Sequence, residues 1–137
     1  MKIHTTNYTD TFIEVAPDCP ATCGEVPPTN ENAKTIASIQ FEMIEKHPYQ
    51  YTSDDILFQV YAERNDLTKS EYKQAREHFF SKGQPCFRSS PLTKRYGWGI
   101  HSDKDGKIAI YGCDTTEYKK KSSDTTLKVI KAMRSGK

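Results

Sequence analysis

The most informative absence in this chain is a gap in its negative charge. No Asp or Glu occurs among the 25 residues from 78 to 102. Over the same stretch, basic side chains alternate with aromatic and hydroxyl-bearing ones. Fixed positive charge beside aromatic faces and hydroxyl groups is the chemistry of a surface that receives an anion. The sequence therefore predicts that this segment holds the working surface of the protein.

The chain also lacks long apolar segments. No apolar run approaches the roughly 18 residues that a membrane-spanning helix requires, and residues 1–7 lack the apolar core of a secretion signal. We therefore predict a cytoplasmic protein with no membrane partner. Its four cysteines are then expected to be reduced thiols.

Hydrophobic content is low, at 35% of 137 residues, and charged residues make up 28%. Six Phe, eight Tyr and one Trp compensate, because aromatic side chains bury large areas. The net charge of +2 conceals an asymmetry, since residues 117–137 carry seven basic and two acidic side chains. We predict one globular domain over residues 1–118, followed by a basic tail or short C-terminal helix over residues 119–137.

Three segments combine helical spacing of apolar residues with a capping residue at the start. The capping residue is Thr35 in the first segment, Thr52 or Ser53 in the second and Thr68 in the third. The predicted helices cover residues 35–47, 52–64 and 68–83. Period-two patterns predict strands over residues 12–15, 96–101 and 107–111, the last two joined as a hairpin. The predicted fold is α+β, with three helices covering one face of a small antiparallel sheet that includes this hairpin.

The candidate ligand-binding residues all lie in the segment without acids; they are Arg88, Ser89, Ser90, Lys94, Arg95, Tyr96 and Trp98. Arginine forks match carboxylate or phosphate, and loop hydroxyls add donors, so the predicted partner is an anionic small molecule. Glycines on both sides of Trp98 indicate a bulge or the close approach of a ligand or another backbone. The alternative is that Arg88 and Arg95 pair with the acidic helix start at 54–55 and only fix the loop.

A second hypothesis is a small enzyme that uses Cys86 or His101. A thiolate near Arg88 would be favoured by charge, but a buried, inert state is the more common one for a free cysteine. For His101, a half-buried and hydrogen-bonded structural role suits the sequence equally well. Cys19 and Cys23 form the one close pair of potential metal ligands, which is too few for a structural zinc site. We therefore predict neither a metal nor a cofactor.

A third hypothesis is a nucleic-acid-binding module, because three helices followed by a hairpin is also the order of a winged helix. The charges disfavour it. The third predicted helix carries mixed charge, and Asp103 and Asp105 would lie at the tip of the wing, where phosphates approach.

Four sequence segments resemble a family of small, mainly bacterial proteins known only as a domain of unknown function. They are His4–Tyr8 (HTTNY), Phe12–Ala16 (FIEVA), Tyr51–Asp55 (YTSDD) and Ser90–His101 (SPLTKRYGWGIH). The resemblance covers about residues 4–118. It implies no activity, cofactor or catalytic residue.

Overall fold

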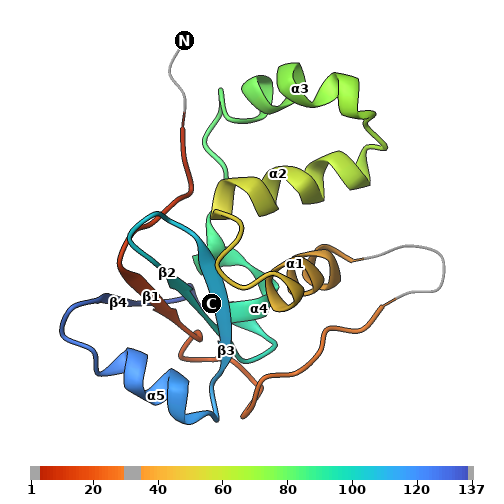
Figure 1. The fold of residues 1–137 in the computed structure, drawn as a ribbon. Helices are drawn as coiled ribbons and strands as arrows, with labels where there is room; N and C mark the ends of the chain where they lie inside the picture. The colour runs from red at the N-terminus through yellow and green to blue at the C-terminus, as the bar shows by residue number, and fades with distance from the viewer. Residues whose placement is uncertain (1–3, 30–34, 136–137) are drawn as a thin grey trace.

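A computed structural model describes residues 4–29 and 35–135 of the chain. Its centre is a four-stranded mixed sheet in the order β3-β2-β1-β4 (Figure 1). The strands are β1 (Thr11–Glu14), β2 (Trp98–Ser102), β3 (Ile108–Gly112) and β4 (Lys128–Lys131). β2 is antiparallel to both β1 and β3, whereas β4 is parallel to β1. The predicted α+β class and the β2–β3 hairpin are confirmed, and β4 is an addition.

The turn of the hairpin follows from two residues. The Asp103 carboxylate accepts hydrogen bonds from the amides of Asp105 and Lys107, each at 2.9 Å. Gly106 has a φ of 80°, a conformation that side chains with a Cβ rarely adopt. Together they reverse the chain between β2 and β3.

The three predicted helices are present with the expected caps. They are α1 (Ile36–Lys46), α2 (Ser53–Arg64) and α3 (Tyr72–Phe79), the last preceded by a 3₁₀ turn, η1 (Lys69–Glu71). Thr35 accepts a hydrogen bond from the Ser38 amide, and Thr52 and Thr68 form capping boxes. The structure adds two shorter helices, α4 (Pro91–Lys94) and α5 (Thr116–Ser122), and a second 3₁₀ turn, η2 (Phe87–Ser89).

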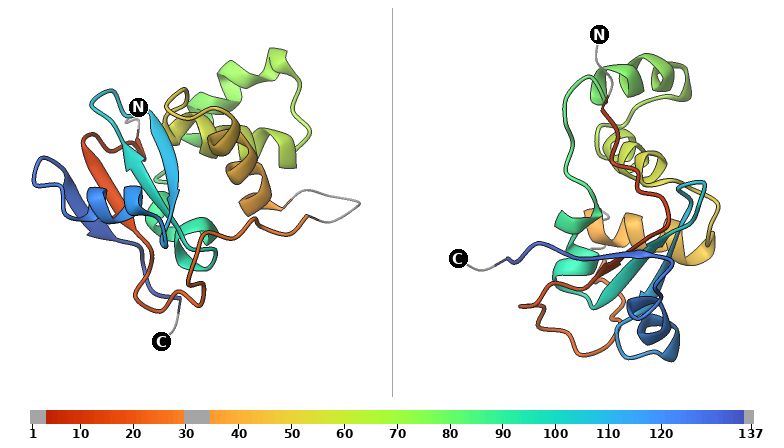
Figure 2. Two further views of the ribbon diagram at one scale, coloured as in Figure 1. Left: turned by 60° about the horizontal axis from the view of Figure 1, so that its bottom comes forward. Right: turned by 90° about the vertical axis from the view of Figure 1, so that its left-hand side faces the viewer.

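We predicted that the helices cover one face of the sheet, but in the structure helices lie on both faces. α1 contacts β3, and α4 contacts β2. α5 contacts β1 and β3. α2 packs on α1, and α3 packs on α2 at the end of the molecule far from α5 (Figures 1 and 2). No helix in the described ranges is long and apolar enough to cross a membrane.

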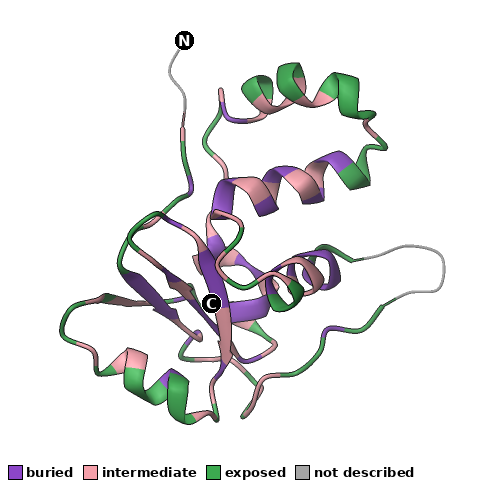
Figure 3. Ribbon diagram, in the orientation of Figure 1, coloured by how far each residue is buried: buried purple, intermediate pink, exposed green. Residues whose placement is uncertain are grey.

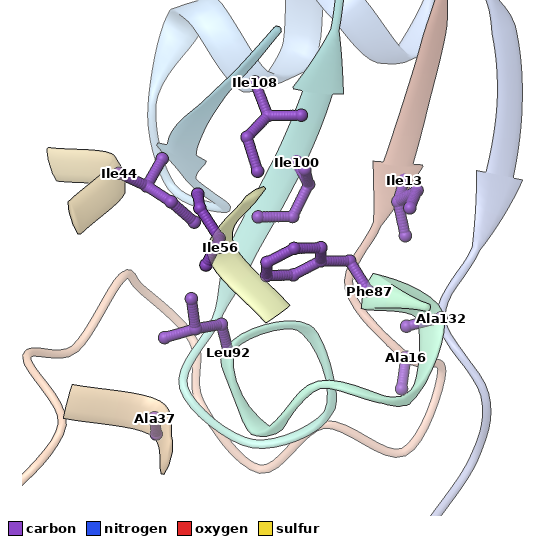
Figure 4. Close-up of a cluster of buried hydrophobic side chains, with 10 residues drawn as sticks. All are labelled: Ile13, Ala16, Ala37, Ile44, Ile56, Phe87, Leu92, Ile100, Ile108 and Ala132. Atoms are coloured by element: carbon purple, nitrogen blue, oxygen red, sulfur yellow. The ribbon is translucent and has the colours of Figure 1, made fainter. Parts of the chain in front are cut away.

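Two hydrophobic clusters follow from this arrangement. The main core lies between the sheet and the helices and includes Ile13, Ile56, Phe87, Leu92 and Ile100 (Figure 4). A smaller cluster of Phe58, Ala62 and Phe80 joins α2 to α3 and its following turn. The outer sides of α3 and α5 are largely exposed (Figure 3).

The boundary that we expected at residue 118 falls inside α5. Beyond it, the chain returns to the sheet as β4, where Lys128 donates its amide to the Asp10 carbonyl at 2.9 Å. The basic C-terminal segment thus supplies an edge strand of the fold.

Candidate functional site

A pocket that we call the basic pocket lies where α1, α2 and α4 meet. It has a volume of about 350 Å³, and its lining residues are Thr35, Ile36, Ala37, Arg64, Ser89, Pro91, Lys94, Arg95 and Tyr96. Three of these side chains are cationic, and none of the described lining residues is acidic. Such a pocket favours an anionic occupant.

Local structure explains why the cations converge. Pro91 begins α4 behind its Ser90 cap, and the helix ends after one turn, with the Arg95 amide bonded to the Pro91 carbonyl at 2.8 Å. Lys94 and Arg95 therefore stand at the end of α4. Arg64 is the last residue of α2, which reaches the same place from another direction.

The N-terminus of α1 forms another wall of the basic pocket, through Thr35, Ile36 and Ala37. α1 has 11 residues and no acidic side chain in its first turn. The partial positive charge of a helix N-terminus is therefore not neutralised within that turn. It adds to the field of the three cations.

The three cations are not engaged by the acids that the structure describes. Across residues 4–29 and 35–135, no carboxylate lies within ion-pairing distance of Arg64, Lys94 or Arg95. Arg64 and Arg95 are exposed, and Lys94 is half-buried. Their charge is therefore available to a ligand.

The acidic start of α2, which we considered as the partner of Arg88 and Arg95, is occupied elsewhere. Asp55 lies 3.0 Å from the Arg76 guanidinium. Burial raises the pKa of Asp55, but the Thr52 backbone amide and Arg76 lower it more, so that the pKa lies below its usual value. Asp54 accepts hydrogen bonds from both Thr5 and Thr6.

Four of the seven predicted binding residues line the basic pocket: Ser89, Lys94, Arg95 and Tyr96. The Ser89 hydroxyl also has a partner in the protein, since it donates to the Met133 sulfur at 3.2 Å. The residues of the predicted segment therefore divide between the pocket and the framework.

The other three predicted residues make framework contacts. Arg88 donates from Nε to the Lys131 carbonyl at 2.9 Å and so fastens β4. Ser90 is buried and donates to Gln40 Oε1 at 2.6 Å. Trp98 donates to the Glu25 carbonyl at 2.7 Å, and its ring packs on Phe41 with centroids 5.3 Å apart.

The glycines beside Trp98 permit close approach, but to the protein itself. A Cβ on Gly97, whose φ is 79°, would overlap the Cys23 carbonyl oxygen. A Cβ on Gly99 would lie 2.5 Å from the Phe12 ring and 2.7 Å from the Tyr118 ring. These contacts explain the glycines without a ligand.

Sequence reasoning missed Arg64. Its position at the end of the predicted helix over residues 52–64 was visible, because basic residues commonly end helices. What the sequence did not indicate is that this helix end lies beside α4. That proximity depends on the packing of α1 on both α2 and α4.

A second hollow, the apolar cavity, adjoins the basic pocket. It has a volume of about 460 Å³ and lies between α2, the N-terminal part of α1 and the loop from Gln84 to Pro91. Ile36, Arg64, Ser89 and Pro91 line both spaces. The two hollows therefore share a border formed by these four residues.

Cys86 lines the apolar cavity, and its sulfur lies 3.4 Å from the Tyr8 hydroxyl. Burial and this contact raise the pKa of Tyr8 to about 12. At that value Tyr8 keeps its proton near neutral pH. It is thus no base for activating the thiol there.

His101 lies on the opposite side of the sheet from Cys86. Ile100 joins the main core together with Phe87, so the neighbouring residues of β2 face α5, as the contact of Gly99 with Tyr118 indicates. The two candidate catalytic residues are therefore not brought together.

His101 instead belongs to a tyrosine network. Its Nδ1 lies 2.8 Å from the Tyr49 hydroxyl, which lies 2.6 Å from the Tyr111 hydroxyl. Burial and the nearby Lys121 lower the pKa of His101, against the opposing effect of Asp103 and other acids. A neutral, hydrogen-bonded imidazole is the expected state near pH 7.

Three of the cysteines lie near one another. Burial raises the pKa of the Cys113 thiol, and Cys19, Asp114 and Cys23 raise it further through their charges. All four cysteines are free and half-buried. In the part of the chain that the structure describes, no group of three or more His, Cys, Asp or Glu residues is arranged to hold a metal ion.

Together these features define a class: an α+β protein with a four-stranded mixed sheet and a basic pocket that adjoins an apolar cavity. A family model described as a family of unknown function (DUF6157) matches residues 3–137, and the chain belongs to that family. The match includes the basic C-terminal segment, which lies outside the residues 4–118 over which the sequence motifs resemble the family. No curated protein and no solved structure matches the chain.

Proposed function

We propose that this protein binds a small anionic molecule, through a carboxylate or phosphate group, in the basic pocket. The observation that carries the proposal is the convergence of Arg64, Lys94 and Arg95 on one hollow without a carboxylate partner among the described residues. Like charges repel, and folding alone gives no reason to gather three of them. An anion would offset that repulsion.

The chemistry of the lining suits such a ligand. The guanidinium groups of Arg64 and Arg95 present planar forks that match two oxygens of one anionic group, and Lys94 adds a mobile point charge. The volume of about 350 Å³ lies near the lower end of the range for small-molecule pockets, about 300–1,000 Å³. A small head group fits this space.

The two alternative functions have less support. An enzyme using Cys86 or His101 lacks a paired nucleophile and base, because these residues lie on opposite sides of the sheet. For a winged-helix module, the tip of the β2–β3 hairpin would have to approach phosphates, but it carries Asp103 and Asp105. In addition, Arg76 of the third helix is already paired with Asp55.

The direct test is an NMR titration of the uniformly ¹⁵N-labelled protein with inorganic phosphate and, separately, with acetate. We expect saturable shifts of the amides of Ile36, Ala37, Lys94, Arg95 and Tyr96. The double variant Arg64→Gln, Arg95→Gln should weaken the affinity at least tenfold, about 1.4 kcal/mol. It should leave the dispersed spectrum of the folded protein otherwise intact.

Lys104→Gln is the matched control, because Lys104 is an exposed cation in the hairpin turn, outside the basic pocket. It should bind phosphate as the parent does. The proposal fails if neither anion shifts the pocket amides. It also fails if the shifted amides are those of the basic residues 119–121 and the double variant leaves these shifts unchanged.

A further inference from the structure

We propose that the ligand is amphipathic: an anionic head group held in the basic pocket, with an apolar body that extends into the apolar cavity. This inference rests on the proposed function and adds to it the chemical class of the ligand. It follows from the adjacency of two hollows that differ in chemistry and share four lining residues. A small inorganic ion would use one of them and leave the other empty.

The apolar cavity has the lining that a hydrocarbon or aromatic body requires. Its walls include Leu57, Val60, Tyr61, Phe79 and Pro85, from α2, the end of α3 and the following loop. Its volume of about 460 Å³ falls within the range of small-molecule sites. None of its described lining residues is acidic, so nothing there repels an anion at the entrance.

Arg64 and Ile36 stand at the junction and line both spaces. The Ile36 side chain is 39% exposed, although it is large and apolar. It offers a ligand apolar surface directly beside the cations. Arg64 can meet the head group while its methylene stem continues the apolar wall.

Charge complementarity selects this occupant over a purely apolar one. A hydrocarbon without charge would leave three cations without counter-charge at the mouth of the cavity, and an amphipathic cation would meet repulsion from all three. A second copy of the chain is a further possible occupant. The experiment distinguishes it by the mass of the complex.

The experiment compares ligands that differ in one property at a time, each below its aggregation concentration. Octanoate carries both a negative charge and an apolar chain. Acetate has the charge without the chain, octanol has the chain without the charge, and octylamine has the chain with a positive charge. Octyl phosphate keeps the chain and replaces the carboxylate by a phosphate. We expect octanoate and octyl phosphate to bind at least tenfold more tightly than acetate, and octanol and octylamine to bind more weakly than octanoate. Calorimetry or NMR gives the affinities.

Cys86 provides a readout at the cavity itself. Its thiol lines the apolar cavity, whereas Cys19, Cys23 and Cys113 line neither hollow. Bound octanoate should slow the labelling of Cys86 by a thiol reagent and leave the labelling of the other three unchanged. Mass spectrometry of the digested protein assigns the label to each cysteine.

Two substitutions separate chain binding from head-group binding. Ile36→Asn should reduce octanoate affinity about threefold or more and acetate affinity by a smaller factor, because acetate has no chain that could contact the Ile36 side chain. Val26→Asn is the matched control, because Val26 is also apolar and is 70% exposed, but lines neither hollow. It should have no effect.

The outcomes assign failure to one proposal or the other. If acetate and phosphate bind through Arg64 and Arg95 but octanoate binds no better, the amphipathic ligand is refuted and the anion site remains. If octanol binds as tightly as octanoate and the arginine variants change nothing, both are refuted. A concentration-dependent dimer in light scattering that Ile36→Asn abolishes, with no octanoate binding, would assign the cavity to a second copy and overturn the inference.

Discussion

Two groups of cations in this protein contrast in what surrounds them. Arg76 and Arg88 are fixed by the fold: Arg76 pairs with Asp55 and lies over the Phe58 and Phe80 rings at 5.8 and 5.5 Å, and Arg88 holds β4 through a backbone carbonyl. Arg64, Lys94 and Arg95 line a pocket and have no acidic partner among the described residues. We call the first group the fixed cations and the second the open cations.

The contrast shows that the partners of a cation, and not its type, indicate its role. Arg88 and Arg95 look equivalent in the sequence, seven positions apart in the same segment without acids. One serves the framework, and the other faces a hollow. If the contrast holds, replacing a fixed cation should lower the stability of the protein, whereas replacing an open cation should not.

The largest effect on stability is expected at Asp54, whose carboxylate is already hydrogen-bonded to other parts of the protein. Asp54 is buried and accepts from the Thr6 amide at 2.7 Å, the Thr6 hydroxyl at 2.6 Å and the Thr5 hydroxyl at 2.7 Å. Asp54→Ala should lower the free energy of unfolding by about 2–4 kcal/mol, because it removes charge-assisted bonds and leaves a buried donor unpaired. Urea denaturation measures this.

Glu63→Ala is the control, since Glu63 is an exposed acid on the same helix. It should change stability by no more than about 0.5 kcal/mol. Equal effects of the two substitutions would mean that Asp54 is not committed to the N-terminal segment. It would then be free to neutralise a cation.

The outlines of the fold were predictable because local patterns determine them. Thr35, Thr52 and Thr68 mark helix starts, and the turn residues from Asp103 to Gly106 mark the hairpin. Each signal lies within a few residues of the element that it specifies. Propensity and periodicity therefore suffice.

β4 and α4 were missed for different reasons. β4 has only four residues, with Val129 and Ile130 between two lysines, and it is a strand only because β1 offers a parallel edge more than 100 positions earlier in the chain. α4 is a single turn, shorter than helical periodicity can reveal. The site was half predicted for the same reason: Lys94 and Arg95 are local to one segment, whereas Arg64 arrives through tertiary packing.

The next prediction concerns a fixed cation. Arg76→Ala should lower the free energy of unfolding by about 1–2 kcal/mol, through loss of the contacts with the two rings and of a partly exposed ion pair. Lys73→Ala, an exposed cation on the same helix, should have almost no effect. A loss for Arg76→Ala no greater than that for Lys73→Ala would contradict the division into two groups.

The Arg76 pair also predicts a pH effect. Because the pKa of Asp55 is lowered in the folded protein, the stability that it adds is present above the usual carboxyl range and is lost as the pH falls through the folded pKa. The free energy of unfolding should therefore be higher at pH 6 than at pH 3, and Arg76→Ala should make this difference smaller. Thermal unfolding at the two pH values measures the difference.

A smaller effect is expected at His101, on the other face of the sheet. Its lowered pKa means that the unfolded chain takes up the proton more readily, so stability should decline as the pH falls below about 6.5. His101→Gln should flatten that decline, whereas His78→Gln, at an exposed position, should not. Lys121→Gln should raise the pKa of His101, measured by NMR titration, because it removes a nearby positive charge.

The smallest effect on stability is expected for the open cations, and it is the sharpest test of the contrast. Replacing Arg64, Lys94 or Arg95 by Gln removes no acidic partner that the described residues supply, so each change should stay within about 0.5 kcal/mol. Replacing all three should raise the unfolding temperature slightly at low salt, because mutual repulsion is relieved. The gain should vanish near 0.5 M salt, where screening already suppresses that repulsion.

A triple variant less stable than the parent by more than about 1 kcal/mol would show that these side chains support the framework after all, and the anion site would lose its main argument. A gain that salt removes has the opposite meaning. Folding would then be slightly better without the three cations, so their convergence would have to serve something outside the chain. Phosphate should stabilise the parent and not the triple variant, because a ligand stabilises only the form that binds it.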